Sequence, residues 1–326
     1  MKRLLPLLFL PFFLCAGEYR LGNGYELLDQ LTVGGYISAE YKRGDELNEL
    51  EIDDIAVLGY GNLTHSLSYL VEFEAAKYHS WDLEEDTQES NPDFFTERAY
   101  LNYKLSNQLQ VTAGKFITPG SYWNQVPINV LRDTTSKPRL SQNIFPRLVS
   151  GLDVEGYLPG SDTLKYALFV QKNEDIDHGY NNFYCDDHVG AAVTKEFDEL
   201  EARVWGGRFE LEDGTASGYA GATLRYETPE LRILAEAAQS RTDYPTIQGE
   251  KSKESVFLQG AKKLARNHSI AGRYEYYRDE SLDLKENLYI LGYNYRPLFP
   301  VSLKAEYLLH DDSANSMALF SFSILF

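Results

Sequence analysis

Four basic side chains fall in one segment near the middle of the chain, residues 119–147, and set it apart from its surroundings. They are Arg132, Lys137, Arg139 and Arg147. The only acid among them is Asp133, whereas the whole chain has 31 Lys and Arg against 49 Asp and Glu and a formal net charge of −18. Arg and Lys gathered in an acidic protein are suited to holding or steering an anion at short range. A nucleic acid partner is not expected, because it requires a basic surface.

Hydrolytic chemistry requires a nucleophile beside a His that a third group orients. The six His, at positions 65, 79, 178, 188, 268 and 310, all lie in or near connections between expected strands. Acids stand close to three of them, as in "LLHDDSAN", but acids are so common in these connections that chance explains the proximity. We therefore predict no catalytic residue, no cofactor and no metal ligand, and an outer-membrane hydrolase is the least favoured alternative.

The elements that must position the basic segment are strands. Apolar and polar residues alternate in segments such as "LTVGGYISAEYKR" and "PVSLKAEYLLH", and helical periodicity is hard to find. The pattern predicts about sixteen strands. They lie near 31–43, 50–62, 66–78, 94–105, 108–118, 147–158, 163–174, 187–197, 200–211, 218–227, 230–240, 253–264, 268–278, 286–296, 301–310 and 314–326.

Short and long connections alternate along this series. Those after even-numbered strands are short, such as "LTHS" and "SNQ", and those after odd-numbered strands are longer and acidic, such as "HSWDLEEDTQESNPD". Sorting by length is typical of an up-and-down antiparallel β-barrel with one rim on each side of a membrane. A soluble β-sandwich would also alternate, but its loops need not sort by length. The expected fold is all-β, a transmembrane barrel of about sixteen strands.

Both ends of the sequence support a bacterial outer-membrane location. Residues 1–17 have Lys2 and Arg3, a short apolar core and small residues, which is the layout of a cleaved signal peptide. The mature part, 18–326, then forms the barrel and retains one cysteine, Cys185. The segment "FSFSILF" alternates apolar residues up to Phe326, and these would face lipid. It is similar to the C-terminal signature that the barrel-assembly machinery recognises.

A barrel of this size encloses an aqueous lumen. Charged residues on the expected inner faces favour a water-filled pore, because charge at membrane depth must meet water or a counter-charge. The lumen-wall candidates are Arg98, Arg203, Arg225, Arg232, Arg273, Glu72 and Glu74. Several tyrosines are expected instead in a girdle at the membrane interfaces. They are Tyr274, Tyr276, Tyr277, Tyr289, Tyr293 and Tyr295.

The longest connection, the third extracellular loop near 119–147, is too apolar for a solvated loop. It carries Trp123 and Phe145 as well as its basic residues. We expect it to fold into the lumen and narrow it, placing Arg132, Lys137 and Arg139 as selective contacts with Arg147 beside them. The alternative is a loop that packs on the rim or on a neighbouring subunit.

The segment "ERAYLNYKLSNQLQVTAGKFITPG", with the leader, the strand series and Phe326, resembles Gram-negative porins, and most closely the phosphate-selective porin O and P family. The resemblance implies a passive trimeric channel, in some members one that selects phosphate through constriction lysines. Only Lys137 matches those lysines by type and region, with Arg132 and Arg139 as charge equivalents.

The expected function is therefore a porin for passive diffusion of small hydrophilic solutes or ions, with anion or phosphate preference. Two acidic loops, 79–93 and 174–187, favour the alternative of a cation-preferring general porin. They also suit contact with lipopolysaccharide through divalent cations, in preference to a dedicated calcium or magnesium site. Surface adhesion or recognition through the long loops is the remaining alternative.

Overall fold

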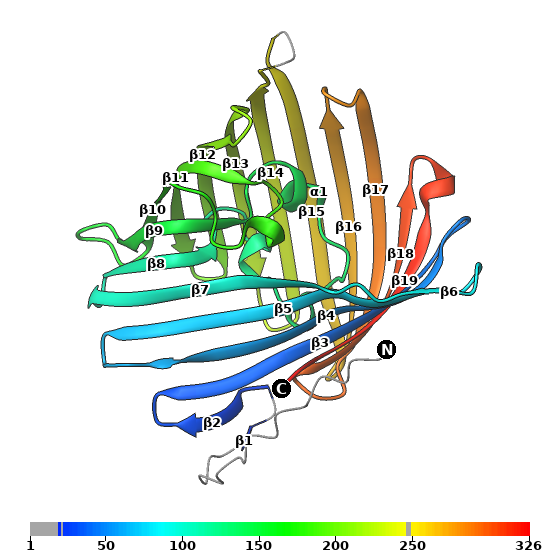
Figure 1. Ribbon diagram of the computed structural model, residues 1–326, viewed down its shortest axis with the longest axis horizontal. Coiled ribbons are helices and arrows are strands. Elements are labelled where there is room, and N and C mark those ends of the chain that lie inside the picture. The colour runs from blue at the N-terminus through cyan, green and yellow to red at the C-terminus, as the bar shows by residue number, and fades with distance from the viewer. Residues whose placement is uncertain (1–18, 21, 246–248) are drawn as a thin grey trace, which may run out of the picture.

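The protein is described by a computed structural model that covers residues 19–20, 22–245 and 249–326 (Figure 1). The expected leader, 1–17, lies outside the described residues. Within them, sixteen long strands pair in sequence order, each antiparallel to the next, and close into one barrel. Three short strands, β1 (Tyr19–Arg20), β2 (Gly24–Leu28) and β6 (Thr87–Glu89), extend its rims. The predicted fold class is confirmed.

The barrel strands agree with the sequence prediction to within a few residues at nearly every end. They are β3 (Leu31–Arg43), β4 (Asn48–Asn62), β5 (Leu67–Asp82), β7 (Asp93–Ser106), β8 (Leu109–Ile117), β9 (Leu148–Tyr157), β10 (Leu164–Gln171), β11 (Cys185–Phe197), β12 (Leu200–Leu211), β13 (Ala216–Glu227), β14 (Leu231–Asp243), β15 (Lys251–Ala265), β16 (His268–Asp279), β17 (Leu284–Tyr295), β18 (Val301–His310) and β19 (Met317–Leu325).

Alternation along each strand separates an apolar outer face from a polar inner face. On β19, Phe320 and Phe322 are 49% and 40% exposed on the outside, whereas Ser321 and Ser323 are buried inside. The barrel closes where β19 pairs with β3. There Phe326 and Gly35 exchange two backbone hydrogen bonds of 2.8 Å, which satisfy the strand edge that an open sheet would leave unpaired.

The two ends of the barrel differ. One end carries the brief turns after β4, β7, β9, β11, β13, β15 and β17, and we call it the turn end. The other, the loop end, carries the connection 118–147 and the segment 172–184. Three connections at the loop end are shorter than the sequence pattern predicted, because the strands on either side of them are longer. They are 44–47, 212–215 and 280–283.

One girdle residue was assigned to the wrong face. Tyr274, Tyr289 and Tyr293 are exposed on the outside, but Tyr277 is only 4% exposed and its hydroxyl donates to Asp279 at 3.1 Å. Tyr276 and Tyr277 are neighbours, so a strand must point them to opposite sides.

Within the described residues, no helix is long and apolar enough to cross a bilayer.

Candidate functional site: a constriction built by two loops

The connection between β8 and β9, residues 118–147, runs through the interior of the barrel rather than outward (Figure 1). It contains two short 3-10 turns, η1 (Trp123–Gln125) and η2 (Asn129–Leu131), and one short helix, α1 (Arg139–Asn143). We call it the inner loop.

Apolar side chains of the inner loop are buried against two different parts of the wall. Trp123 and Phe145 pack in a cluster with Trp205 and Phe257, which point inward from β12 and β15. Val130, fully buried, packs instead with a cluster on β3 and β4. The inner loop therefore crosses the lumen between these two parts of the wall.

Inward-facing carboxylates of the wall fix the backbone of the inner loop. Glu236 on β14 accepts from Ser121 Oγ and Tyr122 N, both at 2.6 Å, and from Trp123 N at 3.2 Å. Glu306 on β18 accepts from the backbone N–H groups of Thr135 and Ser136 and from Ser136 Oγ. Two buried carboxylates thus satisfy donors that a loop inside a barrel would otherwise leave unpaired.

Basic residues of the wall hold the carbonyl groups and the acid of the same loop. Arg203 donates to Gly120 O at 2.9 Å, Arg232 donates to Asp133 at 2.9 Å, and Arg273 donates to Ser136 O at 3.0 Å. The guanidinium of Arg225 lies 4.2 Å from the centre of the Tyr122 ring. These four predicted lumen-wall residues do face inward, but they contact the inner loop instead of standing free in the channel.

A second segment, 172–184, also folds inward and clamps the inner loop. Asn182 donates to Gln142 O at 2.8 Å and to Phe145 O at 2.9 Å, and it accepts from Arg147 N at 2.8 Å. Its own position is fixed from the wall, because Lys115 on β8 donates to Asp177 O. This contribution was not predicted, because the acids of 174–187 indicated only an acidic outer loop.

Three of the four predicted constriction residues line one narrow pocket between the inner loop and β7. They are Arg132, Lys137 and Arg147, and Glu97 of β7 lies in the same lining. Arg147 stacks over the ring of Tyr180, 5.4 Å from its centre. The ammonium of Lys137 forms no hydrogen bond or ion pair with any described residue. The charge of Lys137 is thus not tied to any single carboxylate among the described residues.

Arg132 has a different surrounding. Its guanidinium is buried and donates to the carbonyl oxygens of Val126, at 2.7 Å, and Pro127. Burial and the nearby charge of Arg147 lower the pKa of Arg132 below its ordinary value. Arg132 therefore stabilises the fold of the inner loop through these hydrogen bonds.

Arg139 lies outside this pocket. It begins α1, its side chain is 39% exposed, and it pairs with Glu286 of β17 at 3.2 Å. Its backbone N–H donates to Glu275 at 2.9 Å. The structure therefore separates Arg139 from the other three residues. This separation was not predicted, because the sequence does not show that the loop turns between Lys137 and α1.

An acidic wall faces the basic side of the constriction. Tyr36 on β3 donates to Glu74 at 2.6 Å and to Glu97 at 3.0 Å, and Tyr180 donates to Glu74 at 3.1 Å. The predicted lumen residues Glu72 and Arg98 lie beside them as an ion pair of 2.5 Å. Lys137 is within electrostatic range of Glu40 on β3 and Asp53 on β4. Positive side chains of the inner loop and negative side chains of the wall thus lie close together around the narrow pocket.

Glu97 was missed because of a β-bulge. The register between β5 and β7 shifts so that Glu72 pairs with Arg98 and Phe73 pairs with Thr96, which leaves Glu97 as the extra residue. Strict alternation assigns only Arg98 to the lumen, but Glu97 is 1% exposed and also points inward.

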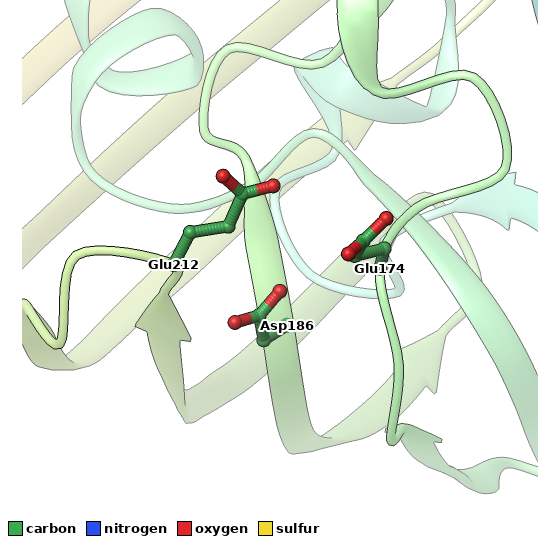
Figure 2. A group of neighbouring side chains, drawn as sticks. All are labelled: Glu174, Asp186 and Glu212. Carbon is green, nitrogen blue, oxygen red and sulfur yellow. The ribbon is translucent and has the colours of Figure 1, made fainter.

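A cluster of three carboxylates stands on the loop end. Glu174, Asp186 and Glu212 bring one oxygen each to within 4.8 Å of one another (Figure 2). Glu174 and Glu212 are exposed to solvent, and Ca²⁺ takes six to eight oxygen ligands. The cluster adds negative charge to the rim that the sequence analysis described around 174–187.

The sequence matches no known family profile and no curated protein. Solved structures do resemble the barrel. OmpT of Vibrio cholerae superposes with a TM-score of 0.64 at 14% identity, over 92% of this chain and 98% of that one. The anion-selective porin from Comamonas acidovorans gives 0.64 at 13%, over 90% and 98%. OmpF of Salmonella typhi gives 0.65 at 12%, over 95% and 100%. At these identities the likeness shows a shared fold, the sixteen-stranded barrel of outer-membrane porins.

Proposed function

We propose that the protein is an outer-membrane porin through which small hydrophilic solutes and ions diffuse passively. The observation that carries this proposal is the charged constriction, where Lys137 and Arg147 of an inner loop lie within electrostatic range of Glu74, Glu97 and Asp53 on the wall of a porin-type barrel. Solved porins of the same fold support it. No catalytic step is part of the proposal.

The balance of charges supports a general pore with weak ion selectivity. The half-buried ammonium of Lys137 favours anions, and the acids of β3, β4, β5 and β7 favour cations. The anion or phosphate preference that the sequence suggested thus depends on how far Arg147 and Lys137 offset these acids. A strong preference for phosphate is the less favoured form of the proposal.

The reversal potential of the refolded protein in a planar bilayer, across a KCl gradient, tests both points. We expect an open conductance with a small reversal potential. Lys137→Gln should lower the chloride-to-potassium permeability ratio by about twofold, since water screens a half-exposed charge. A folded barrel that carries no current would refute the porin, and a wild-type ratio in Lys137→Gln would remove this residue from the selectivity site.

The outer face supports insertion in lipid. Leu258 near the middle of β15 is 52% exposed, and its neighbour Gln259 is buried on the inside. Leu258→Arg should lower the free energy of unfolding from liposomes by about 2–4 kcal/mol, because it places a charge in hydrocarbon. Urea titration of the barrel measures this loss. A conservative Leu258→Ile variant is the control, and an Arg variant as stable as wild type would contradict a lipid-facing surface.

The partners follow from the same proposal. A homotrimer is supported by the trimer form of OmpT of Vibrio cholerae. The acidic loop end suits lipopolysaccharide bridged by divalent cations, and Phe326 in its outward alternation suits recognition by the barrel-assembly machinery. Export through a cleaved leader at 1–17 completes the proposal.

A further inference from the structure

A second charged pocket lies at the turn end, below the inner loop and apart from the constriction. It is a cavity of about 230 Å³ between the turns that join β13 to β14, β15 to β16 and β17 to β18. We call it the turn-end pocket. Its charged lining residues are Asp133, Glu230, Arg232, Lys262, Lys263, Arg266 and Arg296. Five bases against two acids make it the reverse of the acidic loop end.

Most of this positive charge has no counter-charge. Arg232 is neutralised, because it pairs with Asp133 at 2.9 Å and with Glu227 at 2.9 Å. Lys262, Lys263, Arg266 and Arg296, in contrast, form no ion pair with any described residue. Since Asp133 is already engaged by Arg232, Glu230 is the one carboxylate left in the lining to balance these four cations.

Arg296 is the most constrained of these cations. Its guanidinium donates to two carbonyl groups of the inner loop, Val130 O and, at 2.8 Å, Arg132 O. Carbonyl oxygens satisfy its hydrogen bonds but carry no full negative charge. Burial lowers the pKa of Arg296 below its ordinary value, the charge of Asp133 acts in the opposite direction, and repulsion by the neighbouring Arg232 lowers the pKa further. An anion in the pocket would relieve this repulsion.

The pocket is also held in shape before any ligand arrives. The backbone N–H of Lys263 donates to Glu230 O, and that of Arg296 donates to Asn267 O, both at 2.8 Å. These bonds tie the three turns side by side. The backbone that carries these cations is therefore in place before a ligand binds, and the ligand has to order only the exposed side chains of Lys263 and Arg266.

We propose that the turn-end pocket is a binding site for a small anion with two or more negative charges, of the di- or tricarboxylate class. Guanidinium groups match the geometry of a carboxylate, and separate carboxylates of one ligand can meet Arg296, Arg266 and Lys263 together. This inference rests on the proposed channel, in which such a solute passes the turn end. It adds a second binding position for the solute, on the turn-end side of the constriction.

Isothermal titration of citrate into the refolded barrel in a neutral detergent tests the site whether or not the barrel conducts. We expect one citrate per chain, and about tenfold weaker binding for Lys263→Gln/Arg266→Gln, which removes two charge contacts. The matched control is Lys104→Gln/Lys165→Gln, which removes two bases from a separate pocket at the same end. The control should bind citrate as wild type does.

The sidedness of block in a bilayer of zwitterionic phosphatidylcholine gives a second measurement. Citrate should reduce the KCl current at lower concentration from one side than from the other, and the Lys263→Gln/Arg266→Gln variant should lose this difference. No calorimetric binding, or equal weakening by both double variants, would overturn the pocket while leaving a conducting porin intact. A barrel that binds citrate but carries no current would instead overturn the porin alone.

Discussion

Replacing Glu236 and Glu306 together with Gln is expected to free the inner loop and enlarge the open channel. Each carboxylate accepts from backbone N–H groups on its part of the loop, Tyr122 and Trp123 at one point and Thr135 and Ser136 at the other. A Gln amide keeps the size but offers one acceptor oxygen and a competing NH₂ donor. Losing these charge-assisted bonds should lower the free energy that holds the loop on the wall by about 3 kcal/mol for the two substitutions together. The population of channels with a detached loop should then rise roughly a hundredfold.

Single-channel recording measures this release as a larger and noisier open current. Limited trypsin cleavage after Arg132 or Arg139 should become faster in the same variant. Glu286→Gln is the control, since Glu286 binds the side chains of Arg139 and His310 and no loop backbone. Wild-type current and cleavage in the double variant would mean that apolar packing alone holds the inner loop.

Arg147→Ala should have the largest effect on ion selectivity. Arg147 lies over Tyr180 and within electrostatic range of Glu74 and Glu97. Burial raises the pKa of Tyr180 well above its ordinary value, so this residue remains a neutral hydroxyl that cannot replace the lost charge. Without Arg147 the acids of β5 and β7 dominate the passage. We expect the chloride-to-potassium permeability ratio to fall about fivefold, the factor for one unit charge near an ion in water.

Arg139→Ala is the matched comparison for this test. Arg139 also belongs to the basic set of the inner loop, but its side chain is partly exposed and pairs with Glu286 away from the narrow pocket. Its removal should leave the reversal potential unchanged and cost at most about 1 kcal/mol of stability. Equal shifts for Arg139→Ala and Arg147→Ala would contradict the constriction as described.

Period-two alternation was sufficient to predict the barrel, because a wall with lipid outside and water inside imposes the same pattern on every strand. The prediction failed where a strand departs from strict alternation. The bulge at Glu97 is such a place. The extra residue in β7 points the Glu97 side chain into the constriction, and the alternation of apolar and polar residues on either side of it is unchanged. A single sequence contains no signal for the strand register that creates this bulge.

The residue types of the site could be predicted from the sequence, but the contacts between those residues could not. The apolar and basic character of 119–147 indicated a loop that folds inward. The role of Arg203, Arg232 and Arg273 in holding that loop depends on contacts between residues far apart in the chain. The clamp by Asn182 was hidden for the same reason, because its segment looked like any other polar connection.

The attachment of the inner loop to the end of the strand series has a consequence for biogenesis. The loop is held by Glu306 on β18 and by Ser321 on β19, whose hydroxyl lies 2.5 Å from that of Thr135. Val130 of the same loop packs on β3 and β4, on the other side of the seam, so an assembly intermediate in which β19 has not yet joined β3 cannot make both sets of contacts. Seam closure and completion of the permeability barrier become one event, and a barrel stalled before closure would leak.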